Sequence, residues 1–281
     1  MPKNKNEVLK NIRVNRVGEH EWAFEYPRLT MEAMDGLDEA IEHYRSGDFA
    51  SAKIQFNGLV NKFPEFIDAY HHLALTLDAM ELTYQAFNLI KEAVDMGLSA
   101  LPHNFYFGRD LLPWLELENR PFLRAYHFCG LKYYWLGETA KAVCIFNNLL
   151  DINPNDNQGA RAMAINCYLA MKRPFDVLRI AETYPGDMIA ETFYGKVLAL
   201  FQLDRLQEAK EALEEAARFL PLVAAEIAKK QHRKPKNLQS KYMTHGGKDE
   251  AYHYWIATAQ YWKQTPGAIE FVRDYMTPKK S

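Results

Sequence analysis

Histidine, cysteine and arginine carry most of the chemistry open to this chain of 281 residues, and their spacing matches no catalytic motif. No glycine-rich phosphate loop, no G-x-S-x-G nucleophile turn and no H-E-x-x-H zinc helix occurs. His71 and His72 are adjacent, and neighbours on a helix project about 100° apart, which makes a poor metal-binding pair. The sequence therefore predicts no catalytic residue, no metal and no cofactor, and an enzyme would need a site formed between distant helices.

The three cysteines, Cys129, Cys144 and Cys167, are widely spaced and include no C-x-x-C pair. Such a set is typical of reduced thiols in a cytosolic protein and argues against a disulfide framework or a zinc site. The N-terminal residues lack the apolar stretch of a secretory signal, and no apolar run reaches the roughly 20 residues that span a bilayer. We therefore expect a cytoplasmic protein without a membrane partner.

Charge is nearly balanced, with 34 basic against 36 acidic side chains and a formal net charge of -2. This balance gives no general attraction to nucleic acid. One run, residues 229–241, holds six lysines and arginines without an acidic residue. A single short run is typical of a solvated linker, so nucleic acid is not an expected partner.

A frame of small residues, a large apolar residue and a proline recurs along the chain. Residues 137–146 open one copy that ends at Pro154, residues 47–56 open another that ends at Pro64, and a third copy ends at Pro221. Small residues are needed where two helices cross closely, and proline stops the second helix. These spacings resemble the tetratricopeptide repeat (TPR), a helix–turn–helix unit of about 34 residues.

The frame predicts an all-α fold, a right-handed TPR-type superhelix of about five hairpins, in place of a generic alanine-rich helical bundle. The array covers 33–222, and we expect it to behave as one cooperative unit, with hairpins at 33–66, 67–100, 123–156, 157–189 and 190–222. The fourth hairpin departs most from the pattern, because Asp176 replaces a small residue and Pro185-Gly186 breaks the chain early.

Three segments lie outside the frame. Residues 101–122 form a 22-residue insertion rich in aromatic residues, which is either a structural plug or a lid over the concave face. Within the N-terminal extension, 1–32, Trp22, Phe24 and Tyr26 alternate, which predicts a lone extended segment on the first hairpin and no β-sheet. Residues 223–281 hold the basic linker and two helices that would cap the open end of the array.

Three stretches, residues 112–124, 150–161 and 250–269, resemble a family of prokaryotic TPR proteins akin to the suppression-of-tumorigenicity protein of animals. The string Asn-Pro-Asn-Asp-Asn-Gln-Gly within the second stretch is the most specific part. The resemblance covers roughly residues 30–275 and implies the fold, but it brings no catalytic residue with it.

The first helices of stacked hairpins line a concave groove, where these repeats offer a binding surface. The polar and aromatic residues expected at groove positions are His71, Arg124, His127, Asn157, Gln158, Arg161, Tyr168 and Tyr194. Guanidinium groups bind carboxylates in a bidentate fork, so Arg124 and Arg161 could hold an acidic peptide. Alternatively, they pair with Glu116, Glu118 or Asp156 of the same chain.

The sequence thus predicts a non-catalytic scaffold that binds a protein or peptide, an acidic one included, on its concave face. Leu37 and Ile41 occupy positions where chaperone-binding relatives carry a carboxylate clamp, so a chaperone cofactor is not expected. The alternatives are a homo-oligomeric structural protein, with a homo-dimer built on exposed aromatic residues, and an enzyme with a cryptic site.

Overall fold

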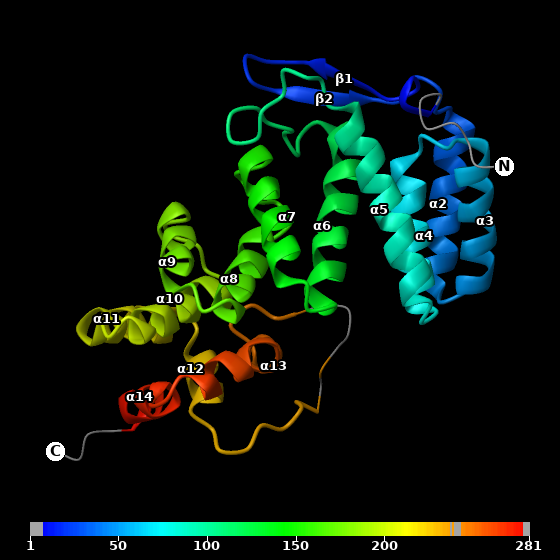
Figure 1. Ribbon diagram of the computed structural model, residues 1–281. Coiled ribbons are helices and arrows are strands. Elements are labelled where there is room, and N and C mark those ends of the chain that lie inside the picture. Colours follow the sequence, from blue (N-terminus) through cyan, green and yellow to red (C-terminus); the bar gives the residue numbers. More distant parts are fainter. Residues whose placement is uncertain (1–7, 237, 239–242, 278–281) are drawn as a thin grey trace. The chain divides into compact units, whose positions relative to one another are not determined.

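A computed structural model describes residues 8–236, 238 and 243–277 (Figure 1), and the chain divides into two compact units, with the boundary between Ala160 and Arg161. The expected all-α fold is confirmed, since paired helices make up most of both units. None of the described helices is long and apolar enough to cross a membrane.

The first unit holds three helical hairpins, and Figure 1 shows α2 to α5 lying side by side. The hairpins are α2 (Met31–Ser46) with α3 (Phe49–Lys62), α4 (Ile67–Ala79) with α5 (Thr83–Ala100), and α6 (Arg120–Trp135) with α7 (Thr139–Ile152). The hydroxyl of Thr30 caps α2 by accepting from the Ala33 amide at 3.3 Å, and Gly47 ends it with a φ of 86°.

The small residues of the repeat frame lie where helices cross. Ala40 and Ala52 are fully buried between α2 and α3. At the corresponding place in the third hairpin, a Cβ added to Gly130 would lie 2.8 Å from Cε1 of Phe146. The frame therefore reflects a steric limit at each crossing, as its spacing predicts.

The second unit holds the other two hairpins and the C-terminal helices. The hairpins are α8 (Ala160–Ala170) with α9 (Pro174–Thr183), and α10 (Ala190–Gln202) with α11 (Leu206–Phe219). They are followed by α12 (Pro221–Ile227), α13 (Lys248–Gln264) and α14 (Ala268–Met276). Helix α12 packs against α11, α13 and α14, and α13 also contacts α10. Trp262 of α13 is fully buried, so these helices extend the core of the second unit.

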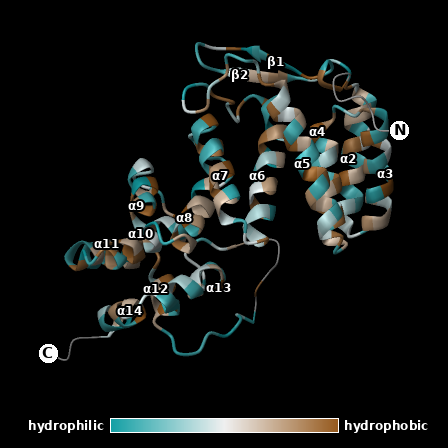
Figure 2. Cartoon of the chain, viewed as in Figure 1, coloured by the Kyte–Doolittle hydropathy of each residue, from teal (hydrophilic) through white to brown (hydrophobic). Residues whose placement is uncertain are grey.

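The connection between α12 and α13 contains the basic run, whose described residues, 229–236, are largely hydrophilic in Figure 2. Its start is held to the second unit, because Glu226 pairs with Lys229 and accepts from Nδ1 of His232 at 2.9 Å. The His232 ring stacks on Trp255 with 3.9 Å between centroids. Residues 237 and 239–241 of the expected linker lie outside the described residues.

The N-terminal extension differs from expectation, because it forms a β-hairpin. Strand β1 (Arg13–Arg16) pairs antiparallel with β2 (Trp22–Glu25), the segment expected to lack a partner. The hairpin lies on the insertion, where Glu21 forms a parallel bridge with Leu111. The short polar strand β1 carries no alternation of apolar residues, so no sequence pattern indicates it.

The insertion is itself well packed. Leu112 is fully buried, and its amide donates to the carbonyl of Ile152 at 2.8 Å. The insertion ends in a short 3₁₀ helix, η1 (Leu117–Asn119), whose Asn119 side chain accepts from the Phe24 amide and donates to the Trp22 carbonyl, both at 3.0 Å. These contacts favour the structural plug over a lid.

Candidate binding site

Helices α2, α4 and α6 share a face, termed here the first-helix face, that carries Met34, Asp68 and Arg124 at the second position of the first three repeat units. Nη2 of Arg124 donates to Oδ2 of Asp68 at 2.7 Å. The side chain of Asp68 is only 9% exposed, whereas that of Arg124 is 34% exposed. Neighbouring repeats are thus joined by an ion pair across this face.

Two histidines follow on α4. Nδ1 of His72 donates to the Asp68 carbonyl at 2.9 Å and lies 3.4 Å from Oδ1 of the same residue. Burial alone would raise the pKa of Asp68, but the nearby imidazole of His72 and the charge of Arg124 hold it well below its usual range. Burial, reinforced by the His72 charge, lowers the pKa of His71 to about 3, so this predicted site residue is neutral at pH 7.

His127, on α6, is half-buried, and burial lowers the pKa of its imidazole as well. Its ring meets Phe146 edge-on with 5.6 Å between centroids. Asn157 and Gln158 come before α8, in a turn, so they are not on a first helix as expected. The turn is closed by Asp156, whose carboxylate accepts from the Ala160 amide at 2.6 Å.

Where the N-terminal extension meets the first-helix face, a hollow of about 520 Å³ opens; we call it the N-terminal pocket. The pocket is lined by Glu25, Tyr26, Leu29, Met34, Phe66, Asp68, Leu117, Glu118, Arg120, Pro121 and Arg124. All of these belong to the first unit. The extension and the end of the insertion supply seven of the eleven lining residues, a role that the sequence patterns of these segments did not indicate.

Three buried polar atoms in this wall have no hydrogen-bond partner among the described residues. They are Oη of Tyr26, Oδ1 of Asp68 and Nε of Arg124. Burial, followed by the negative charges of Asp68 and Glu118, raises the pKa of Tyr26 well above its usual value, so its hydroxyl is a donor. Buried polar groups are normally paired, so these three atoms, which have almost no accessible surface, are unusual in the wall.

The predicted residues of the second unit are engaged with their own chain. Arg161 holds Asp187 through two hydrogen bonds, 2.7 Å from Nε and 3.0 Å from Nη2, and its guanidinium lies over the Tyr184 ring. Tyr168 is 2% exposed, and its hydroxyl accepts from Arg179 at 3.1 Å. Tyr194 is fully buried and donates to the Leu220 carbonyl at 2.7 Å, so it has no surface to offer a partner.

Both arginines expected to hold an acidic ligand therefore pair within the chain. Arg124 pairs with Asp68 and Arg161 pairs with Asp187, two carboxylates that were not among those expected from the sequence. Nearness in sequence guided that expectation, whereas Asp68 reaches Arg124 from the preceding hairpin.

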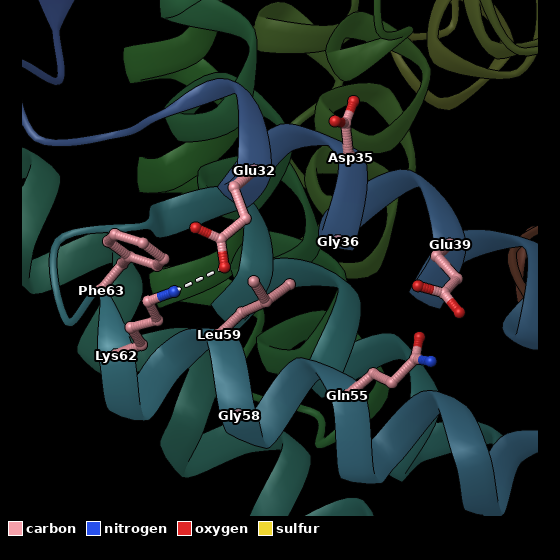
Figure 3. A pocket seen from close by; sticks show the side chains of 9 residues that line it. All are labelled: Glu32, Asp35, Gly36, Glu39, Gln55, Gly58, Leu59, Lys62 and Phe63. Carbon is pink, nitrogen blue, oxygen red and sulfur yellow. Dashed lines mark hydrogen bonds and ion pairs between the residues drawn. The ribbon is translucent and has the colours of Figure 1, made fainter.

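A second hollow of about 580 Å³ lies between α2 and α3 of the first hairpin. Figure 3 shows Lys62 reaching Glu32, at 2.8 Å, with Asp35 and Glu39 further along α2. These three carboxylates are exposed, so solvent and salt screen their charges. No group of three or more potential metal ligands comes together within the described part of the chain.

No protein-family model matches the chain, and no curated protein matches it. Among solved structures, a tetratricopeptide repeat protein from Parabacteroides merdae ATCC 43184 is similar, with a TM-score of 0.52, 15% identity and coverage of 89% of this chain and 82% of that one. YrrB, described as a TPR protein with an unusual peptide-binding site, gives a TM-score of 0.48 at 14% identity over 67% of this chain and 87% of its own.

A putative kinesin light chain from Podosopora anserina with nearly identical TPR-like repeats gives a TM-score of 0.47 at 14% identity, over 67% of this chain and 94% of its own. At such identities only the fold can be compared. The helical hairpins, the small residues at their crossings and the similarity to the Parabacteroides structure agree: this chain has the tetratricopeptide-repeat fold.

Proposed function

We propose that the protein is a non-catalytic scaffold that binds a peptide or a segment of a partner protein on the first-helix face of its first unit, with the N-terminal pocket as the anchor point. Stacked TPR-type hairpins build extended surfaces suited to such partners. The observation that carries the proposal is the N-terminal pocket itself, an open hollow in which buried polar atoms lack partners.

The proposed site therefore differs from the expected groove in the hairpins that form it. The residues expected at groove positions come from the second to fifth hairpins, whereas the proposed site uses the first three. Of the predicted residues, Arg124 lines the N-terminal pocket, and His71 and His127 lie on the same helices as its wall. Tyr194 is left out because it is buried.

Two methionines of α2 allow a matched test. Met34 lines the N-terminal pocket and is 43% exposed, whereas Met31 lies one turn earlier, is 76% exposed and does not line it. Both side chains reach solvent, so replacement by glutamate should leave folding intact. The tagged wild type, Met34→Glu and Met31→Glu are used to capture partners from the native cell, followed by mass spectrometry.

We expect Met34→Glu to lose at least nine-tenths of the proteins enriched by the wild type, and Met31→Glu to retain them. Equal recovery by all three proteins would show that the pocket is not the anchor. Circular dichroism and thermal melting of the variants check that each is folded.

A further inference from the structure

Strand β1 forms one edge of the β-hairpin, and β2 forms the other. The edge of β2 is covered by the insertion, because the Trp22 amide donates to the Leu111 carbonyl at 2.9 Å. The Phe24 amide likewise donates to Oδ1 of Asn119 at 3.0 Å. Figure 1 shows β1 on the far side of β2 from α6 and α7. Among the described residues, nothing covers the edge of β1 in the same way.

The hydrogen-bond ladder of the hairpin determines which backbone groups of β1 point outward. The amides of Trp22 and Phe24 bond the insertion, so these two residues do not bond β1. Their cross-strand partners are Arg16 and Val14. Hydrogen-bonded and non-hydrogen-bonded pairs alternate in an antiparallel ladder, so the N–H and carbonyl groups of Arg16 and Val14 point away from β2. No other described residue bonds these groups.

The outward edge of β1 is accessible. Arg13, Asn15 and Arg16 are exposed, and Val17, which follows the strand, is 51% exposed. An accessible strand edge is a template for one more strand, because its outward N–H and carbonyl groups are bonded only by water. Any extended chain supplies backbone partners of this kind, so charge and side-chain fit decide which chain pairs here.

Charge is separated along the hairpin. Residues 10–25 hold three basic and three acidic side chains, so net charge favours neither an acidic nor a basic partner. Lys10 and Arg13 lie at the beginning, whereas Glu19 and Glu21 lie in the connection to β2. Arg13 is 3.8 Å from Glu25, but both side chains are exposed, so this pair is weak. A strand with the same order of charges fits this edge when it runs antiparallel, because its acidic turn then lies beside the basic beginning of β1.

We propose that β1 pairs with β1 of a second copy of this protein, antiparallel about a two-fold axis, so that the two hairpins form one four-stranded sheet. A two-fold axis makes the contact self-complementary, because each copy offers the same strand to the other. This interface goes beyond the proposed function, since no residue of β1 lines the N-terminal pocket.

One register satisfies the whole edge. In this register Val14 of each copy lies opposite Arg16 of the other, and each such pair exchanges two backbone hydrogen bonds. Asn15 lies opposite the second Asn15, and Arg13 lies opposite Val17. No two like charges therefore face each other across the new pairing.

The two neighbouring registers are excluded. An axis through Val14 would set Ile12 opposite Arg16, but Ile12 is 5% exposed and its amide donates to the Leu9 carbonyl at 3.2 Å. An axis through Arg16 would set two guanidinium groups opposite each other, and like charges in directly opposed positions are destabilising. The Arg16 guanidinium is held in place by two carbonyls of its own turn.

The first experiment measures self-association of the full chain by sedimentation equilibrium. The paired strands are short and bury little surface, so we expect a weak dimer, with a dissociation constant of about 0.1 mM. A chain that remains monomeric at about 0.5 mM overturns the proposal.

The second experiment places opposite charges at one exposed position. In the proposed register Val17 lies opposite Arg13, and this pair occurs twice in each dimer. Val17→Lys should therefore weaken the dimer about tenfold, whereas Val17→Glu should retain or tighten it. Both variants change an exposed side chain, and circular dichroism checks that each is folded. Equal effects of the two charges would contradict the register.

The third experiment tests the register by disulfide cross-linking in a Cys144→Ser background, since Cys144 is the exposed native cysteine. Opposed residues at a non-hydrogen-bonded position have Cα atoms about 4.5 Å apart, which suits a disulfide. Asn15→Cys should therefore form a covalent dimer under mild oxidation. Arg13→Cys is the matched control, because the two copies of residue 13 lie about 13 Å apart. If both variants cross-link equally, or if Asn15→Cys does not cross-link, the proposal is overturned.

Discussion

At the scale of single residues, burial controls the charge state of the first-helix face. His71 is 6% exposed, and its neighbours include His72 and the Arg124 guanidinium, so a proton on its ring would be desolvated and repelled. Asp68, in contrast, favours its charged form, because His72 and Arg124 stabilise the carboxylate. The face therefore keeps one neutral histidine beside one ion pair at pH 7.

The pH dependence of stability follows from these two groups. The pKa of His71 is about 3 in the folded state, against an ordinary value near 6.5. The contribution of His71 to the unfolding free energy is therefore complete above pH 6.5 and is lost as the pH falls toward 3. Asp68 also has a lowered pKa, and its contribution is lost at still lower pH, beginning near its ordinary value of about 4. Stability should thus decline as the solution is acidified from pH 6.5.

His71→Gln tests this dependence. The variant cannot take up a proton at this position, so its unfolding free energy should fall less steeply between pH 6 and 4, by up to about 1.4 kcal/mol per pH unit. Urea unfolding at a series of pH values measures the slopes. His103→Gln is the control, a change in the exposed part of the insertion that should leave the slope unaltered. Parallel slopes for wild type and His71→Gln would contradict the assignment.

At the scale of elements, the crossing of α6 and α7 limits the size of residue 130. Gly130→Ala places a methyl group 2.8 Å from Phe146 and 3.1 Å from Ile145, so we expect a loss of about 1–3 kcal/mol in unfolding free energy. Gly58→Ala is the matched control, because Gly58 is inside α3 and a Cβ there meets nothing within 4 Å. That variant should gain up to about 1 kcal/mol from helix propensity. Similar unfolding midpoints for the two variants would refute the steric account.

The β-hairpin depends on the Asn119 side chain, which is fully buried. It bonds the Phe24 amide and the Trp22 carbonyl, and its Nδ2 also donates to the Pro113 carbonyl at 3.1 Å. Asn119→Ala leaves these backbone groups unpaired and should cost about 2–3 kcal/mol. Hydrogen exchange should show faster exchange of the strand amides in residues 13–25, while α2 and α3 keep their protection. Unchanged exchange in the strands would show that other contacts hold the hairpin.

Prediction from the sequence succeeded where structure is local and failed where it is not. The helical hairpins were predictable because Ala40, Ala52 and Gly130 fill crossings that recur at a fixed spacing. Strand β1 pairs with β2, although neither strand has a strong sequence pattern. The hydrogen bond between Asn119 and Phe24 joins segments that are far apart in the chain. The N-terminal pocket depends on those contacts, so no sequence pattern could have revealed it.

At the scale of the molecule, the predicted array is divided between two compact units, each with its own core. Phe56, Phe122 and Phe146 are fully buried in the first unit, and Tyr194 and Trp262 in the second. The sequence frame carries no sign of the division, because the same repeat spacing continues across it. The boundary instead follows the third hairpin, next to the weakest repeat, where Asp176 takes the place of a small residue.

If each core is a cooperative unit, a local defect should lower the stability of the unit that contains it and leave the stability of the other unit unchanged. Tyr194→Phe removes a hydroxyl that donates to the Leu220 carbonyl and accepts from the Ala224 amide at 3.1 Å, at a cost of about 1–2 kcal/mol. Hydrogen exchange with mass spectrometry should then show less protection in α10 to α12, while α2 to α7 remain as in the wild type. Equal loss of protection in both units would mean that the five hairpins unfold together as a single array, because a defect in one core would then be felt throughout the chain.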